Sequence, residues 1–460
     1  MDTPFTSDCI RSIRISSAPS YGFENAQEPI FQAGCEQWSE AIRKHIVLVL
    51  HHGSAVVRST TVTCFAGITS TIFAAFNKQE KDFVTSSIIA AALHDKTPSV
   101  RSAACRAIGV ISSFPETSLS AEIYEKFFIA VEANTRDSLT SVRITASWAL
   151  ANVCDSLRYR VDERSFEGLS TTSQVVDALI ECALRLTEDG DKVKSNAVRA
   201  LGSISKYVKL RCMTCIKSMD QDVLPFSHQH SSNYHHLSCA GDTRWLERTV
   251  QAFLSCVTTG NVKVQWNVCH ALSNLFSNET IKLQDMDWAP SVFSILLLLL
   301  RDASNFKIRI QAAAALAVPG TPLAYGRSFP DVVKGVEHTL QSLHYDRETT
   351  PTNFKYKRSL ENQLTSTMLH LLSLVSSCHF EALTDFLSKK SSFLEDWLRG
   401  LCVTLHEEDN ASGSSITSTS GDKQKKELIS RAIRSLARSL ETGQSSEMAL
   451  KLQELDSYVN

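Results

Sequence analysis

The stretch Ser141 to Val153 reads Ser-Val-Arg-Ile-Thr-Ala-Ser-Trp-Ala-Leu-Ala-Asn-Val, and it decides the fold. As a helix, it places five apolar residues on one stripe: Val142, Ala146, Ala149, Leu150 and Val153. Arg143 lies in the first turn, and Asp137 lies just upstream. The spacing predicts an amphipathic helix whose apolar stripe packs against other helices.

The pattern recurs along the chain, with copies that begin at residues 57, 100, 142, 193, 264 and 308. Three intervals are 43, 42 and 44 residues; the other two, of 51 and 71 residues, are the same period with an insertion. The first copy matches least closely. A small residue stands nine positions after the first apolar residue in every copy: Ala66, Gly109, Ala151, Gly202, Ser273 and Ala317. Such residues let neighbouring helices approach closely, as an inner layer of stacked helices requires.

Composition limits the possible partners. The chain has 460 residues, 43% of them hydrophobic, with only 17 Gly and 11 Pro, which suits a helical protein. A net charge of −2 gives no global attraction to nucleic acid or to an anionic membrane. We therefore expect protein partners that are selected locally, and nucleic acid is not expected among them.

The sequence also indicates where the protein works. Residues 1–34 lack the apolar core of a secretory signal, and the most hydrophobic run, Val292 to Leu300, is too short to span a membrane. We expect a soluble intracellular protein of the cytoplasm, the nucleus or both. Most of the 13 cysteines lie on apolar faces and are interpreted as reduced core residues: Cys64, Cys105, Cys154, Cys182, Cys256, Cys269 and Cys402.

The chain order suggests four segments. Residues 1–34 are expected to be a poorly ordered lead-in, and residues 35–405 an array of paired helices with a flexible insertion at about 210–241. In each pair, the A helix precedes the B helix that carries the repeated pattern. Residues 406–426 have too little apolar content to fold, which predicts a disordered linker. Residues 427–460 follow as an amphipathic helical segment whose basic face could meet a membrane or an acidic partner, although capping of the last repeat is favoured.

Charged residues recur at the turns between A and B helices. Asp95 precedes Arg101, Asp137 precedes Arg143 and Asp302 precedes Arg309, by six or seven residues each. An Asp near a helix N-terminus accepts backbone N–H groups, and an Arg from the adjacent repeat can pair with it. The recurrence favours a ladder of ion pairs over separate solvated charges.

One polar stretch contains several potential metal ligands: Cys212, Cys215, His228, His230, His235, His236 and Cys239. Its spacing superficially resembles that of a zinc finger. However, a finger needs an apolar core of its own, which this stretch hardly offers. A His-rich insertion without metal is the favoured interpretation, and no metal or other cofactor is predicted.

The residues Val-Arg-x-x-Ala-x-x-Ala-Leu at 142–150 and their relatives resemble the repeats of the HEAT/armadillo superfamily. The resemblance covers roughly 35–405 and implies an all-α fold, a right-handed α-solenoid of helical hairpins. More narrowly, Lys96 to Ile111, Ser141 to Cys154 and the long insertion resemble the C-terminal part of HEAT repeat-containing protein 6 and its plant relatives. That family has no established biochemical activity to carry over.

No catalytic motif was found: the sequence has no phosphate-binding Gly-x4-Gly-Lys-Ser/Thr loop, no Gly-x-Ser-x-Gly elbow and no His-Glu-x-x-His. We therefore predict a non-enzymatic scaffold or adaptor that binds a protein along the concave surface lined by its B helices. The candidate contacts share the polar-edge positions of those helices: Arg106, Trp148, Asn152, Arg199, His270 and Asn274.

A second hypothesis rests on Trp148 and Asn152. Their spacing resembles the Trp-x-x-x-Asn step of importin-alpha-type armadillo repeats, in which Asn holds a peptide backbone and Trp faces stack on Lys stems. This resemblance implies a transport receptor for basic peptides. The step is incomplete elsewhere, because the corresponding pair is His270 and Asn274 in one copy and Arg199 and Ser203 in another.

Overall fold

The computed structural model describes residues 24–114, 120–159, 170–208, 237–345, 354–376, 380–411, 420–441 and 446–459. Within these ranges the regular secondary structure is entirely helical. The chain divides into two compact units, Met1–Ala130 and Val131–Asn460. These are unit 1 and unit 2 below.

Unit 1 begins with a helix that is interrupted by one π-helical turn. Its elements are α1 (Glu24–Ala41), η2 (Ile42–Ile46), α2 (Val47–Val49), α3 (Ala55–Phe65), α4 (Ser70–Ala75), α5 (Lys78–His94) and α6 (Pro98–Ser112). Helix α7 (Ala121–Asn134) follows and crosses the division between the units. The B helix α6 packs against its own A helix α5 and against the preceding B helix α3.

Unit 2 repeats this alternation. Its B helices are α8 (Thr140–Asp155), α10 (Asp191–Tyr207), α12 (Val262–Phe276), α14 (Phe306–Leu316), α17 (Phe354–Val375) and α19 (Ser420–Glu441). Its A helices are α9 (Ser170–Leu186), α11 (Leu237–Thr259), α13 (Ala289–Asp302), α16 (Phe329–Tyr345) and α18 (Glu381–Ala411). Helix α20 (Ser446–Val459) packs on α18 and α19 at the end. The short elements η3 (Ser156–Tyr159), η6 (Leu283–Asp285), α15 (Pro322–Tyr325) and η7 (Gly326–Ser328) lie in connections.

Local sequence explains where several helices begin. Asn77 and Glu80 form a reciprocal capping box at α5: Asn77 Oδ1 accepts from the Glu80 amide at 2.9 Å, and the Glu80 carboxylate accepts from the Asn77 amide at 3.1 Å. Asn261 and Asn305 also cap their helices, α12 and α14, but only by accepting backbone N–H groups on Oδ1. Pro98 is the first residue of α6. A backbone N–H at this position would have no partner within the helix, so its absence in proline does not weaken the helix.

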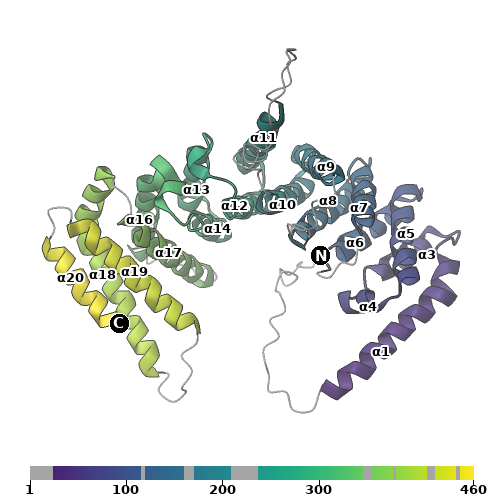
Figure 1. Ribbon diagram of the computed structural model, residues 1–460, viewed down its shortest axis with the longest axis horizontal. Helices are drawn as coiled ribbons and strands as arrows, with labels where there is room; N and C mark the ends of the chain where they lie inside the picture. Colours follow the sequence, from purple (N-terminus) through teal and green to yellow (C-terminus); the bar gives the residue numbers. More distant parts are fainter. Residues whose placement is uncertain are drawn as a thin grey trace, which may run out of the picture. The chain divides into compact units, whose positions relative to one another are not determined.

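The B helices of unit 2 form one layer. Each contacts the next, in the order α8, α10, α12, α14, α17 and α19. In Figure 1, α10, α12 and α14 lie side by side, with α9, α11 and α13 above them in the view. Gly202 lies where α10 meets α12: a Cβ built there would stand 2.8 Å from the Cα and the Cβ of Ala271. The small residue predicted at this position is thus required by the close approach of two B helices.

The predicted charge ladder exists in part. Arg58 pairs with Asp95 of the next repeat, and Arg143 pairs with Asp189, each with an Nε to Oδ2 distance of 2.7 Å. In both cases Nη1 also donates to carbonyl oxygens of the turn just before its own helix. One guanidinium therefore joins the A–B turns of two successive repeats. Asp302 differs because it pairs with its sequence neighbour Arg301 at the surface. In the repeat before Asp302, Gln265 stands where the other B helices carry the Arg that pairs with the Asp of the next repeat. Asp302 therefore has no such Arg to pair with.

Some helices extend beyond their predicted ends. Helix α1 begins at Glu24, inside the segment expected to be a lead-in; residues 1–23 lie outside the described residues. Residues 209–236 of the insertion also lie outside them, and α11 begins at Leu237. Helix α18 continues to Ala411 and α19 begins at Ser420, so only 412–419 of the predicted linker is undescribed.

The C-terminal amphipathic helix packs against the array. Its apolar residues are buried, namely Ile429, Ile433, Leu436 and Leu440, and α19 contacts α17, α18 and α20. This arrangement supports the capping interpretation over membrane contact, because the apolar face is already covered. None of the helices in the described ranges combines the length and apolar character that crossing a bilayer requires.

Candidate functional site

The inner stripe is a set of residues on three adjacent B helices of unit 2 that lie away from the buried apolar stripe. It consists of Trp148, Asn152 and Asp155 on α8, Lys192, Arg199, Ser203 and Lys206 on α10, and Lys263, Trp266, His270 and Asn274 on α12. Asn152 and Ser203 are buried, and the other side chains are exposed or half-buried. Helices α8, α10 and α12 pack in succession, so the stripe runs over three neighbouring helices.

Five of the six predicted site residues lie on this stripe. Trp148, Arg199 and Asn274 are half-buried, His270 is exposed and Asn152 is buried. The sixth, Arg106, is exposed on α6 in unit 1. The structure therefore brings together the five residues of unit 2, whereas Arg106 belongs to unit 1.

Asn152 and Arg199 contact each other across α8 and α10. Arg199 Nη2 donates to Asn152 Oδ1 and, at 3.0 Å, to Asp155 Oδ2. Ser203 Oγ donates to the other oxygen of Asp155. The amide oxygen of Asn152 is thus occupied within the protein, and an importin-type use of that oxygen toward a peptide would first require displacement of Arg199.

On α12 the stripe carries an aromatic pair. The rings of Trp266 and His270 meet edge to face, with centroids 5.8 Å apart. Asn274 lies one turn further, with its Nδ2 3.7 Å from the position where Gly202 would carry a Cβ. Aromatic and amide groups on a rigid helix layer are well suited to contact another polypeptide.

A buried polar ladder beneath the stripe was not predicted from the sequence. Asn196 Nδ2 donates to Ser147 Oγ at 3.0 Å, which joins α10 to α8. Asn267 Nδ2 donates to the carbonyl oxygen of Ser195 at 2.7 Å and to its Oγ at 2.8 Å, which joins α12 to α10. Both Asn residues stand three positions after the first apolar residue of their helix. This shared position in the repeat is the feature of the sequence from which the ladder could have been predicted.

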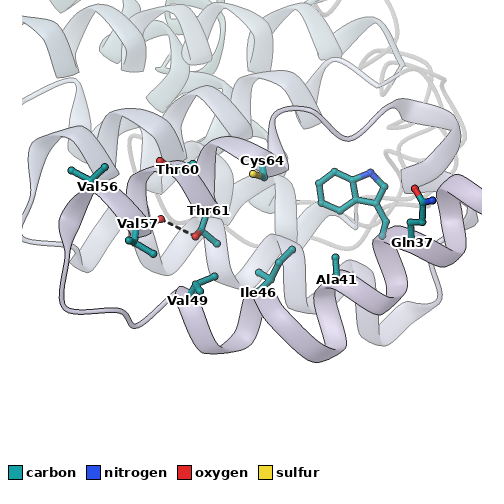
Figure 2. A pocket seen from close by; sticks show the side chains of 10 residues that line it. Gln37, Ala41, Ile46, Val49, Val56, Val57, Thr60, Thr61 and Cys64 are labelled. Carbon is teal, nitrogen blue, oxygen red and sulfur yellow. Dashed lines mark hydrogen bonds between the residues drawn. The ribbon is translucent and has the colours of Figure 1, made fainter.

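Unit 1 contains an apolar cavity of about 570 Å³ between its first helix and α3. Figure 2 shows Ala41, Ile46 and Val49 facing Val57, Thr61 and Cys64 across it. Cys64 is exposed, whereas the sequence had placed it on a core face. The π-helical turn Ile42–Ile46 forms part of the wall; such turns are rare and often occur at functional sites.

Comparisons with known proteins agree with the helical repeats. Residues 87–114, which include the end of α5 and all of α6, match the HEAT repeat family model. An uncharacterized protein of Dictyostelium discoideum is 24% identical over an alignment of 404 residues, which covers 70% of this chain and 26% of that protein. The chain thus spans about a quarter of the length of this relative.

Two solved structures are similar to parts of the chain. A chain of the Kap95:Nup1 complex is 14% identical, with a TM-score of 0.47 over 92% of this chain and 49% of that one. A designed armadillo repeat protein in complex with the peptide (KR)4 is 15% identical, with a TM-score of 0.39 over 59% of this chain and 97% of that one.

The fold is an α-solenoid of the HEAT/armadillo type. Stacked hairpins of this kind have a core that runs through successive repeats. None of the comparisons points to an enzyme family or to HEAT repeat-containing protein 6 in particular.

Chemically reactive groups in the solenoid are mostly buried. Burial raises the pKa of the Cys269 thiol to about 12 and that of Cys256 to about 11, which keeps both protonated. Among the residues that the structure describes, no three His, Cys, Asp or Glu side chains gather as a metal site would require. Six of the seven Cys and His residues at 212–239 lie outside the described residues, as does the side chain of the seventh, Cys239.

Proposed function

We propose that this protein is a non-enzymatic scaffold or adaptor that binds a protein partner on the concave surface lined by its B helices. The inner stripe carries this proposal. It presents Trp148, Trp266 and His270 next to cationic and amide groups, on helices whose opposite sides are buried. A surface of this kind offers stacking, ion pairing and hydrogen bonding at fixed spacing.

A transport receptor for basic peptides is the alternative, and its support is the Trp148–Asn152 step. The neighbouring helices lack this Trp: Arg199 stands in the corresponding position on α10 and His270 on α12. A basic peptide would therefore find only one complete Trp–Asn step on these helices. The general scaffold is therefore the better supported of the two functions.

Photo-crosslinking tests the proposed surface. A benzophenone amino acid at His270 lies on the inner stripe, and one at Gln251 lies on the exposed side of the A helix α11. We expect a discrete crosslinked protein from His270 that is absent from Gln251. Crosslinks of equal yield from both positions, or from Gln251 alone, would contradict binding on the inner side.

Two finer assignments belong to the same proposal. We propose an intracellular location, in the cytoplasm, the nucleus or both, and kinship with HEAT repeat-containing protein 6. Imaging of the tagged chain in cells tests the location; secretion into the medium would refute it. An interaction partner shared with HEAT repeat-containing protein 6 in parallel crosslinking would support the kinship, and disjoint partners would count against it.

A further inference from the structure

Charge is segregated between the two helix layers of unit 2. The six B helices together contain 17 Lys or Arg and 6 Asp or Glu. The five A helices contain 8 Lys or Arg and 14 Asp or Glu. A chain with a net charge of −2 thus concentrates its positive charge on the layer that faces the proposed partner.

Three lysines form a regular row on that layer. Lys192, Lys263 and Lys307 each stand one residue before the first apolar residue of α10, α12 and α14, and all three are exposed. No described residue forms an ion pair with any of them, although Lys307 lies over the ring of Tyr356 at 5.7 Å. Lys206 continues the positive surface along α10, where Arg199 is paired with Asp155, and Lys307 extends the inner stripe onto α14.

The spacing of this row fits an extended chain. Packed helices lie about 8–10 Å apart, and three residues of an extended peptide span about 10 Å. A carboxylate at every third residue of such a peptide would therefore meet one lysine on each helix. Trp266 stands three residues after Lys263 on α12, so an aromatic ring lies beside the middle lysine of the row.

From these observations we infer that the inner stripe binds an acidic, extended segment of a protein partner. This inference rests on the proposed function and specifies its ligand. A protein segment is favoured over nucleic acid because the A helices are acidic and the whole chain is slightly negative. A long polyanion would meet repulsion beyond the narrow positive row, whereas a short acidic segment would not.

The experiment uses the full chain and four fluorescent probes. These are a peptide of about 12 residues with Asp at every third position, the same peptide with Asn or with Lys in place of Asp, and a single-stranded oligothymidine of similar length. Binding is measured by anisotropy at several salt concentrations. The test variant is Lys192→Glu/Lys263→Glu/Lys307→Glu. The matched control reverses three exposed charges elsewhere in unit 2: Arg244→Glu/Lys282→Glu/Lys389→Glu.

We expect the Asp peptide to bind the wild type and the control, with an affinity that falls as salt is added, and to lose about tenfold or more in affinity for the test variant. A milder variant, Lys192→Gln/Lys263→Gln/Lys307→Gln, guards against misfolding and should lose an intermediate amount. Circular dichroism melts confirm that each variant is folded.

Other outcomes overturn the inference and locate the error. Equal binding of the Asn peptide would refute the acidic ligand while leaving the protein-binding surface intact. Preference for the Lys peptide would favour the transport-receptor alternative, and preference for the oligonucleotide would favour nucleic acid. If no probe binds, the inference fails, and the His270 crosslink independently decides whether the proposed function survives.

Discussion

At the scale of single residues, hydrogen bonds between B helices define how the layer is assembled. Asn267 is buried and donates to both the backbone and the side chain of Ser195. A buried amide group that donates two hydrogen bonds stabilises one alignment of α12 against α10. A shift of either helix along the other would leave buried polar atoms without partners.

Replacement of Asn267 by Ala should therefore destabilise the protein. The expected loss is about 2 kcal/mol of unfolding free energy, because Ser195 Oγ loses its donor and a small cavity remains. Urea unfolding followed by circular dichroism measures it. Asn274→Ala on the same helix is the control, since Asn274 is half-buried and should change stability by less than about 0.5 kcal/mol. Equal losses for the two variants would refute the special role of Asn267.

The Arg143–Asp189 pair predicts a pH dependence. The hydrogen-bonded guanidinium of Arg143 lowers the pKa of Asp189 below its ordinary value. A lowered pKa in the folded state means that the pair stabilises fully above about pH 4 and loses its contribution as the pH falls through the folded pKa. Asp189→Asn should lower the melting temperature at neutral pH, and the difference from the wild type should shrink as the pH falls below the ordinary aspartate pKa of about 4.

Asp302→Asn is the matched control for this prediction. Arg301 also lowers the pKa of Asp302, but the pair is exposed and joins sequence neighbours, so it should contribute little at any pH. A difference between Asp189→Asn and the wild type that stayed constant from neutral to acid pH would show that Asp189 acts by its shape rather than by its charge.

At the scale of helices, a side chain at a close contact between two helices would push them apart, and glycine avoids this cost in stability. Gly202 on α10 and Gly400 on α18 are both helical, and Ala is favoured over Gly inside a helix by about 1 kcal/mol. They differ in surroundings: a Cβ at Gly202 meets Ala271 at 2.8 Å, whereas a Cβ at Gly400 meets nothing within 4 Å.

The two Gly-to-Ala substitutions should thus have opposite signs. Gly202→Ala should destabilise the protein by about 1–3 kcal/mol, since α10 and α12 must move apart. Gly400→Ala should stabilise it by up to about 1 kcal/mol. Thermal melts of the two variants provide the measurement. Stabilisation by both substitutions would show that α10 and α12 are not in the close contact described here.

The sequence predicted the helices better than the contacts between them. The expected B helix at 262–276 coincides with α12, because an apolar stripe at helical spacing is a local property. The start of α1 at Glu24 and the π-helical turn Ile42–Ile46 were missed, since no apolar stripe or capping residue in the sequence marks either of them. Individual partners such as Asn152 and Arg199 stand 47 residues apart, and repeat register alone does not show that they meet.

At the scale of the whole molecule, the solenoid in unit 2 behaves as a row of similar modules. Each B helix mainly contacts its own A helix and the adjacent B helices, so stability and ligand contacts are distributed over successive repeats. The inner stripe then acts as a sum of moderate contacts, and loss of several positively charged side chains should weaken binding more than loss of any one of them.

Lysine footprinting tests the central claim, that the B-helix layer is the binding surface, most directly. The full chain is acetylated with and without the protein captured by the His270 crosslinker, and modification is measured by mass spectrometry. The account predicts slower acetylation of Lys192, Lys263 and Lys307 in the complex, with Lys282 and Lys389 unchanged. Protection of Lys282 and Lys389, with the other three lysines unaffected, would contradict it.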